Sequence, residues 1–203
     1  MLPGNSQILT CPYCGQKKEI MSLRSGNTVG AQLWSDNKQI APMLPEISYV
    51  QKCLHCKKYF IRSRQEAVYA NSGFSTEQGL LSFAEMKEAF AQLSQEKFLE
   101  KKEEANVRVM LHHAYNDYYF REGRHRTVAE ADQKLFQENA LWLIEHFITD
   151  NVMKAEFYRE VGDMGKAKSL IENVTGDNDF MKRIVATIKE KINKGDKAVF
   201  LIK

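Results

Sequence analysis

The chain has 203 residues, which is enough for one domain of ordinary size and a small one. Its 43% hydrophobic and 27% charged residues are typical of a packed core in water, and no apolar run approaches the roughly 20 residues of a transmembrane helix. Of the net charge of +3, residues 1–66 carry nine Lys or Arg against four Asp or Glu, so composition leaves nucleic-acid binding open for that part only. The first residues lack the charged and apolar regions of a secretory signal, so we expect a cytoplasmic protein.

The four cysteines form two pairs with identical spacing, Cys-Pro-Tyr-Cys and Cys-Leu-His-Cys, at Cys11, Cys14, Cys53 and Cys56. Two residues between ligands let one tight turn direct two thiolates at a metal, and two such turns complete a tetrahedron. Four soft thiolates select Zn2+ and fill its shell, so we expect one structural ion. Gly15 follows the first pair, where the turn often needs a positive φ, whereas Lys57 in the matching place predicts a strained or differently shaped second turn.

Other uses of the cysteines agree less well with the sequence. Two disulfides would suit a secreted protein, for which we find no signal. A thioredoxin-like redox pair needs only one such motif, near a βαβ pattern. A rubredoxin-like iron site is the main alternative to zinc. We expect His55, inside the second turn, to be an exposed turn residue and not a ligand.

The residues around the two pairs predict short strands at 18–22, 28–34, 48–52 and 59–61, with turn-forming residues at 25–27 and 35–37. This pattern resembles a zinc ribbon with an enlarged β-hairpin, and the resemblance covers about residues 7–62. Such a small unit buries too little surface to fold alone, and we expect metal binding to supply the deficit, on the order of 10 kcal/mol.

From residue 75 onward apolar residues recur at helical spacing, and no Pro follows Pro45. The first predicted helix has Ser75 or Thr76 as its cap and is followed by a polar bend at 95–102. Further helices are predicted from residue 107 to near 123 and at 131–147, 152–161, 167–174 and 180–192, and residues 199–202 are a short strand or a docked tail. The sequence therefore predicts an α+β protein, with a zinc ribbon over residues 1–66 and a helical domain over 67–203.

The fourth and fifth predicted helices carry a regular spacing of small and bulky residues, Ala155, Tyr158, Gly162, Ala167 and Ile171. This resembles one tetratricopeptide repeat, in which small residues let two antiparallel helices approach closely. The match is partial, because Asn151, Lys154 and Asp179 stand where the family prefers Trp, Leu and Pro, and a generic antiparallel bundle is the alternative. The layout of ribbon and repeat-like helices resembles a group of uncharacterised bacterial proteins, which implies an interaction role at most.

The sequence contains no recognisable catalytic motif, neither a Gly-rich phosphate loop nor a metalloprotease or serine-hydrolase signature. His112 and His113 are the strongest candidates for a catalytic pair. Adjacent helical residues cannot share one face, however, so we expect these histidines at the edge of the core or on the surface. We therefore expect a protein that is not an enzyme. An enzyme with a site between ribbon and helices is the third alternative.

The function that these features favour is a zinc-binding adaptor that binds a protein or peptide partner through its helical domain. Trp34, Tyr115 and Tyr119 are candidate contact residues, with core packing as the alternative for each. Trp34 would pack with Met43 and Leu44 under the ribbon hairpin in that case. The second function is nucleic-acid binding, with Tyr59 and Phe60 as stacking platforms among the basic residues Lys17, Lys18, Lys57, Lys58 and Arg62.

Overall fold

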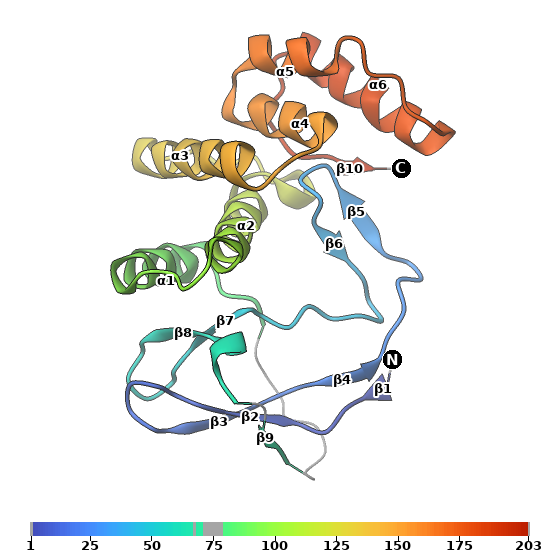
Figure 1. Cartoon of the computed structure of the whole chain (residues 1–203). Coiled ribbons are helices and arrows are strands. Elements are labelled where there is room, and N and C mark those ends of the chain that lie inside the picture. Colours follow the sequence, from blue (N-terminus) through green and yellow to red (C-terminus); the bar gives the residue numbers. More distant parts are fainter. Residues whose placement is uncertain (1, 67, 71–78, 203) are drawn as a thin grey trace. The chain divides into compact units, whose positions relative to one another are not determined.

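The computed structural model describes residues 2–66, 68–70 and 79–202. Within these residues short strands and small sheets come first and six α-helices follow, which confirms the mixed α+β class (Figure 1). The chain divides into two compact units. The first unit comprises Met1–Gln32 and Gln39–Val107, and the second comprises Leu33–Lys38 and Arg108–Lys203.

Two β-hairpins of the first unit carry the cysteine pairs. Strand β2 (Gln7–Thr10) pairs antiparallel with β3 (Lys17–Ile20), and β7 (Val50–Lys52) pairs antiparallel with β8 (Tyr59–Ile61). Each pair of cysteines therefore occupies the turn of a hairpin, as in the ribbon that the sequence resembles. A small core surrounds the sulfurs and contains Leu9, Ile20 and Phe60.

The first unit also contains strands β9, β1 and β4 and a 3-10 turn. Strand β9 (Val68–Tyr69) pairs antiparallel with the other edge of β2. Strand β1 (Leu2–Pro3) pairs antiparallel with β4 (Leu23–Ser25). The turn η1 (Arg62–Arg64) follows β8 directly.

Helix α1 (Phe83–Glu96) begins at a capping box formed by Ser82 and Glu85. The Glu85 amide donates to the Ser82 hydroxyl at 3.3 Å, and the Ser82 amide donates to the Glu85 carboxylate at 3.1 Å. The predicted caps at Ser75 and Thr76 lie outside the described residues. The predicted polar bend is present, because α1 ends at Glu96 and α2 (Lys101–Tyr119) begins five residues later.

Helix α1 is attached to β8 by hydrogen bonds as well as by its apolar face. The Gln92 side chain accepts from the Tyr59 amide at 3.0 Å and donates to the Tyr59 carbonyl at 2.8 Å. The Tyr59 hydroxyl donates to Glu88 at 2.7 Å. The ribbon-like hairpins and α1 therefore form one packed body.

The second unit contains the end of α2, the 3-10 turn η2 (Arg121–Gly123) and four further helices. These are α3 (Glu130–His146), α4 (Asn151–Val161), α5 (Met164–Ile171) and α6 (Asp179–Asn193). Helix α4 packs against α3, α5 and α6 (Figure 1). Gly162 ends α4 with φ 91°, and the fully buried Ala155 and Ala167 allow the close approach of α4 and α5. Among the described residues, no helix combines the length and the apolarity that crossing a membrane requires.

The segment between the two cysteine pairs is not simply an enlarged hairpin of the ribbon. Strand β5 (Gln32–Trp34) pairs antiparallel with β10 (Leu201–Ile202), and Leu33–Lys38 belong to the second unit. The turn before β6 (Gln39–Ile40) contains Asn37 with φ 64°. The strand partner of Trp34 thus lies at the other end of the chain, where local sequence patterns do not indicate it.

The compact units also do not divide the chain at residue 66. Helix α1 and the first turns of α2 group with the strands of the first unit. The expected domains, 1–66 and 67–203, stay a prediction about independent folding.

Candidate functional site

The two cysteine turns have the same backbone geometry. In each, the amide of the first cysteine donates to the carbonyl five residues later, at 2.9 Å for Cys11 and 2.8 Å for Cys53. The residue after the second cysteine adopts a left-handed conformation, with φ 71° at Gly15 and φ 63° at Lys57. The second turn is therefore not shaped differently from the first, although Lys57 adopts a conformation that is strained for a residue with a side chain.

The four cysteine sulfurs converge on one point. All lie within 4.8 Å of one another, and the Cys11–Cys56 and Cys14–Cys53 sulfur distances are both 3.6 Å. A tetrahedral zinc ion with Zn–S bonds of about 2.3 Å needs sulfurs about 3.8 Å apart, whereas a disulfide needs about 2.05 Å. The set could hold one metal ion, and such a geometry is compatible with zinc. In the part of the chain that the structure describes, no other group of three His, Cys, Asp or Glu side chains is placed to do so.

The neighbouring sulfurs favour the thiolate at Cys53 and oppose it at Cys14. Burial disfavours the Cys53 thiolate, but hydrogen bonds from the backbone of Cys56 and His55 and from neighbouring thiols lower its pKa to about 6. A backbone hydrogen bond from Gln16 favours the Cys14 thiolate, but burial and the other three cysteines raise its pKa to about 12. The first thiol therefore ionises readily. A bound divalent cation would stabilise the thiolates and so favour ionisation of the remaining thiols.

Exchanging the residues in the left-handed positions is expected to change stability in opposite directions. Lys57→Gly should stabilise the metal-loaded protein by about 0.5 kcal/mol, because relief of the left-handed strain exceeds the extra chain entropy of glycine. Gly15→Ala should destabilise it by about 1–2 kcal/mol through the backbone alone, since an added Cβ would contact nothing within 4 Å. Guanidinium denaturation followed by far-UV circular dichroism measures both, and a destabilising Lys57→Gly would contradict the geometry of the second turn.

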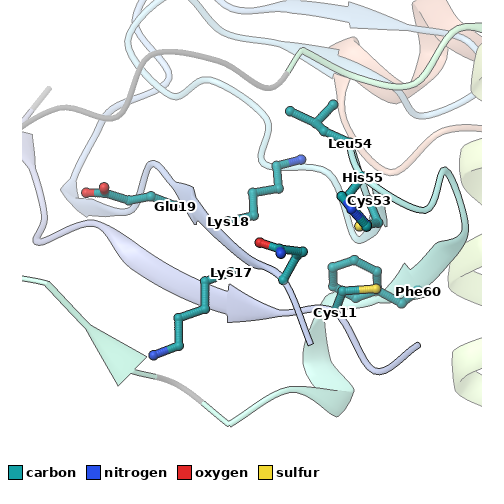
Figure 2. Close-up of a pocket in the computed structure, with 9 residues that line it drawn as sticks. Cys11, Lys17, Lys18, Glu19, Cys53, Leu54, His55 and Phe60 are labelled. Atoms are coloured by element: carbon teal, nitrogen blue, oxygen red, sulfur yellow. The ribbon is translucent and has the colours of Figure 1, made fainter. Parts of the chain in front are cut away.

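A pocket of about 380 Å3 lies beside Cys11 and Cys53 (Figure 2). Lys17 and Lys18 line it but extend to opposite sides of β3, as successive strand residues do (Figure 2). Lys18 Nζ donates to the Gln51 side chain at 3.3 Å and to a backbone carbonyl at 3.4 Å. Burial lowers the pKa of Lys18 to about 8. The two lysines therefore do not converge on one anion.

The structure separates the predicted nucleic-acid residues into two groups. Lys17, Lys57 and Lys58 are exposed, whereas Lys18 and Arg62 are partly buried. Tyr59 and Phe60 are each only 3% exposed, so the expected stacking of bases on these rings is wrong. Lys58 Nζ lies 4.7 Å from the centre of the half-exposed Tyr13 ring, which is the aromatic group beside these lysines.

Trp34 is buried in the second unit and not in a small core of the ribbon. Its ring faces the Arg121 guanidinium at 4.7 Å, whereas Met43 and Leu44 are each 40% exposed. Tyr115 and Tyr119 are each 3% exposed, and Tyr119 donates to Asp132 at 2.7 Å. Core packing therefore describes Trp34, Tyr115 and Tyr119, and their rings present no open surface to a partner.

Sequence reasoning missed a group of charged and polar residues inside the second unit. We call it the buried polar cluster, and it consists of the buried residues Asp36, Lys38, His112, Asn116, Arg121, Glu156, Arg159 and Glu160 with the partly exposed Asp117, which contacts Lys38 and Arg121. One feature of the sequence of α4 could have indicated this cluster. Glu156, Arg159 and Glu160 continue, at helical spacing, the row of buried residues that begins at Val152. Charged residues at the core-facing positions of a helix indicate either that this face is exposed to solvent or that the charges are buried and paired with one another.

Asp36 is at the centre of this cluster. Arg121 donates to both of its carboxylate oxygens, at 2.5 and 3.3 Å, and Asn116 donates at 3.0 Å. Burial opposes the ionisation of Asp36, but the positive charges nearby, with the hydrogen bonds of Arg121, hold its pKa at about 2. Arg121 also donates to Asp117 at 2.5 Å, and Lys38 contacts the other oxygen of Asp117.

Glu160 has a different environment, without a fixed cation in direct contact. Its Oε2 accepts from Asn116 at 3.0 Å and lies 2.9 Å from His112 Nε2. Burial raises the pKa of Glu160 to about 8 and lowers that of His112 to about 4, so both are neutral at pH 7. Oε1 of Glu160 and Nδ1 of His112 are buried and have no hydrogen-bond partner among the described residues. His112 is thus a core residue, and His113 contacts the Asp36 carbonyl at 3.1 Å.

Glu160 is expected to weaken the second unit as the pH rises from about 6.5 to 8. An acid whose folded pKa is raised stabilises the fold below its unfolded pKa, here near 4.5, and this contribution is lost as pH rises through the folded pKa of about 8. The lowered pKa of His112 makes stability rise with pH and so opposes the effect of Glu160, but only below about pH 6.5. Above that pH His112 is neutral in the unfolded protein as well, and its contribution to stability no longer changes. The stability of wild type relative to Glu160→Gln should therefore fall by about 1–2 kcal/mol over this range.

Urea denaturation followed by tryptophan fluorescence measures this difference, since both tryptophans, Trp34 and Trp142, lie in the second unit. A difference that stays constant between pH 6.5 and 8 would show that Glu160 is ionised in the native protein.

Comparison with protein families, with curated proteins and with solved structures found no match to this chain.

Proposed function

We propose that the chain is a cytoplasmic, zinc-binding adaptor without enzymatic activity. The observation that supports it best is the set of four sulfurs within 4.8 Å of one another on two turns of equal shape. Four thiolates fill a tetrahedral shell, so the ion has no position for water or substrate and acts structurally. The site needs reduced cysteines, the state that the cytosol maintains.

Elemental analysis distinguishes zinc from iron. Protein purified from cells grown with both metals should contain one equivalent of zinc per chain and should lack the visible absorption of an iron–thiolate site. Stoichiometric iron, or purified protein without either metal, would contradict the assignment.

The helical second unit is the partner-binding part of this proposal. Its α4–α5 pair has the small residues and the glycine stop of a tetratricopeptide-like repeat. Since Trp34, Tyr115 and Tyr119 are buried, we assign the contact to exposed apolar side chains on and after α3, Leu141 at 43% and Phe147 at 46% exposure. Apolar side chains that a partner covers contribute most to such a contact.

A pull-down with the full chain tests the adaptor role. The variants Leu141→Glu and Phe147→Glu should lose a protein that wild type retains, and Leu99→Glu is the matched control because Leu99 is 76% exposed in the first unit. Retention of the same proteins by all variants, or of none by folded wild type, would count against the proposal.

Nucleic-acid binding is the second candidate, supported by the exposure of Lys17, Lys57 and Lys58 around the cysteine turns. Filter binding across a salt series should then give a steep loss of affinity with salt, and Lys57→Ala with Lys58→Ala should reduce the logarithmic slope by about 1 per lost phosphate contact. The matched control is Lys182→Ala, an exposed lysine of α6. A slope that the two ribbon variants leave unchanged would exclude this surface.

A further inference from the structure

Lys18 is a partly buried ammonium group beside the four cysteines, and the adaptor proposal does not use it. Among the described residues its Nζ contacts neutral oxygens only, the Gln51 side chain at 3.3 Å and the Lys52 carbonyl at 3.4 Å. A cation that is withdrawn from water without a negative partner is costly. A negative charge close to Lys18 would offset this cost.

Strand β3 directs Lys18 toward the cysteine turns. Lys18 pairs in register with Leu9, two residues before Cys11, and the carbonyl that it contacts belongs to the residue before Cys53. It lines the pocket beside Cys11 and Cys53, and Figure 2 shows that it extends to the side of β3 opposite to Lys17. Burial lowers the pKa of Lys18 to about 8, and the charge of Cys53 acts in the opposite direction. Lys18 and Cys53 are therefore close enough to interact electrostatically.

The cysteine centre carries excess negative charge when it holds a divalent metal ion. Four thiolates contribute four negative charges and the ion supplies two positive ones, so two negative charges remain. The backbone donors to Cys53 and Cys14 are neutral amides, so they stabilise this charge without cancelling it. Lys18 brings a full positive charge to the same place.

Other lysines near the turns are less suited to this purpose. Lys52 Nζ pairs with Glu85 at 3.0 Å, so its charge is already compensated. The exposed lysines around the turns are Lys17, Lys57 and Lys58. Water and salt screen charges at such positions, and they screen the partly buried ammonium of Lys18 less.

We propose that Lys18 is the charge-compensating partner of the metal–thiolate centre and that it strengthens metal binding by stabilising negative charge on the sulfurs. This inference rests on the metal site of the proposed function. The ammonium favours the thiolate over the thiol at Cys53, so protons compete less with the metal ion. The alternative is a purely structural contact, because Lys18 also joins β3 to β7 through its hydrogen bonds.

Lys18→Met tests the proposal, because it removes the charge and keeps a side chain of similar length. In competition with a chelator at pH 7, the full chain with this change should bind zinc about tenfold more weakly than wild type. In the cobalt-substituted full chain, the thiolate-to-cobalt charge-transfer band should move to longer wavelength, because the sulfur electrons are then held less tightly. A purely structural contact would lower the affinity without moving this band.

Three further variants complete the test. Lys18→Gln is a second neutral variant and should give the same two changes, whereas Lys18→Arg keeps the charge and should retain the wild-type band. The matched control is Lys17→Met, the exposed neighbour on the other side of β3, which should change neither quantity. A band that both neutral variants leave in place, or that Lys17→Met moves equally, would overturn the assignment of Lys18 while the metal site stands. Wild type that binds neither zinc nor cobalt would overturn the metal site as well.

Discussion

The Cys53→Ser variant is expected to lose its bound metal and to unfold the first unit while the second unit stays folded. Structural zinc contributes on the order of 10 kcal/mol to small domains of this kind, and the core around the four sulfurs consists of a few residues such as Leu9, Ile20 and Phe60. Helix α1 depends on β8 through Tyr59 and Gln92, so part of its helicity should disappear as well.

The second unit has its own core, formed by residues of α4, α5 and α6 such as Ala155, Ile171 and Ile188. Far-UV circular dichroism of Cys53→Ser should therefore retain most of the helical signal. Tryptophan fluorescence should retain a cooperative unfolding transition, because Trp34 and Trp142 both lie in the second unit.

The matched control is His55→Ser in the same turn. His55 is exposed and its ring is not one of the four converging ligands, so this variant should keep one equivalent of metal and the wild-type spectra. Loss of the tryptophan transition in Cys53→Ser would show that the two units share one core, and metal retained by Cys53→Ser would disprove the four-sulfur site.

The Asp36→Asn variant is expected to destabilise the second unit by about 3–5 kcal/mol. The substitution removes the negative charge of Asp36, so the buried positive charge of Arg121 loses its buried ion-pair partner. Arg121 is 2% exposed and donates to both oxygens of Asp36, one of which would become an NH2 donor. Asp36 is also held by Asn116. Urea denaturation followed by tryptophan fluorescence measures the loss.

Adding Arg121→Met to Asp36→Asn should destabilise less than the sum of the single changes, since the stranded charge is then removed. The surface control is Lys194→Ala, which removes the exposed pair with Glu190 and should leave the unfolding midpoint unchanged. Additive effects at Asp36 and Arg121 would mean that the two groups do not interact in the native protein.

Local patterns in the sequence identify the features that are decided by neighbouring residues. The spacing of Cys11 and Cys14, and of Cys53 and Cys56, predicts two metal turns because the geometry of a short turn depends on a few adjacent residues. That Lys57 adopts the same left-handed conformation as Gly15 was decided only by the structure. Gly162 predicts the end of α4 because a left-handed cap favours glycine. The α+β class follows from the change of hydrophobic period along the chain, which requires no knowledge of contacts.

Contacts between distant segments decided the rest. The hairpin at Leu33–Lys38 joins the second unit because β10, near the other end of the chain, pairs with β5, and no local pattern specifies that partner. Trp34 and Tyr115 have the composition of a binding surface, but burial depends on what packs over them. In the sequence, Asp36, Arg121 and Glu160 resemble charged residues that face solvent. Only the tertiary fold buries them next to one another. In such surroundings of low polarity, a hydrogen bond contributes more to stability than in water, and a polar atom without a partner costs more.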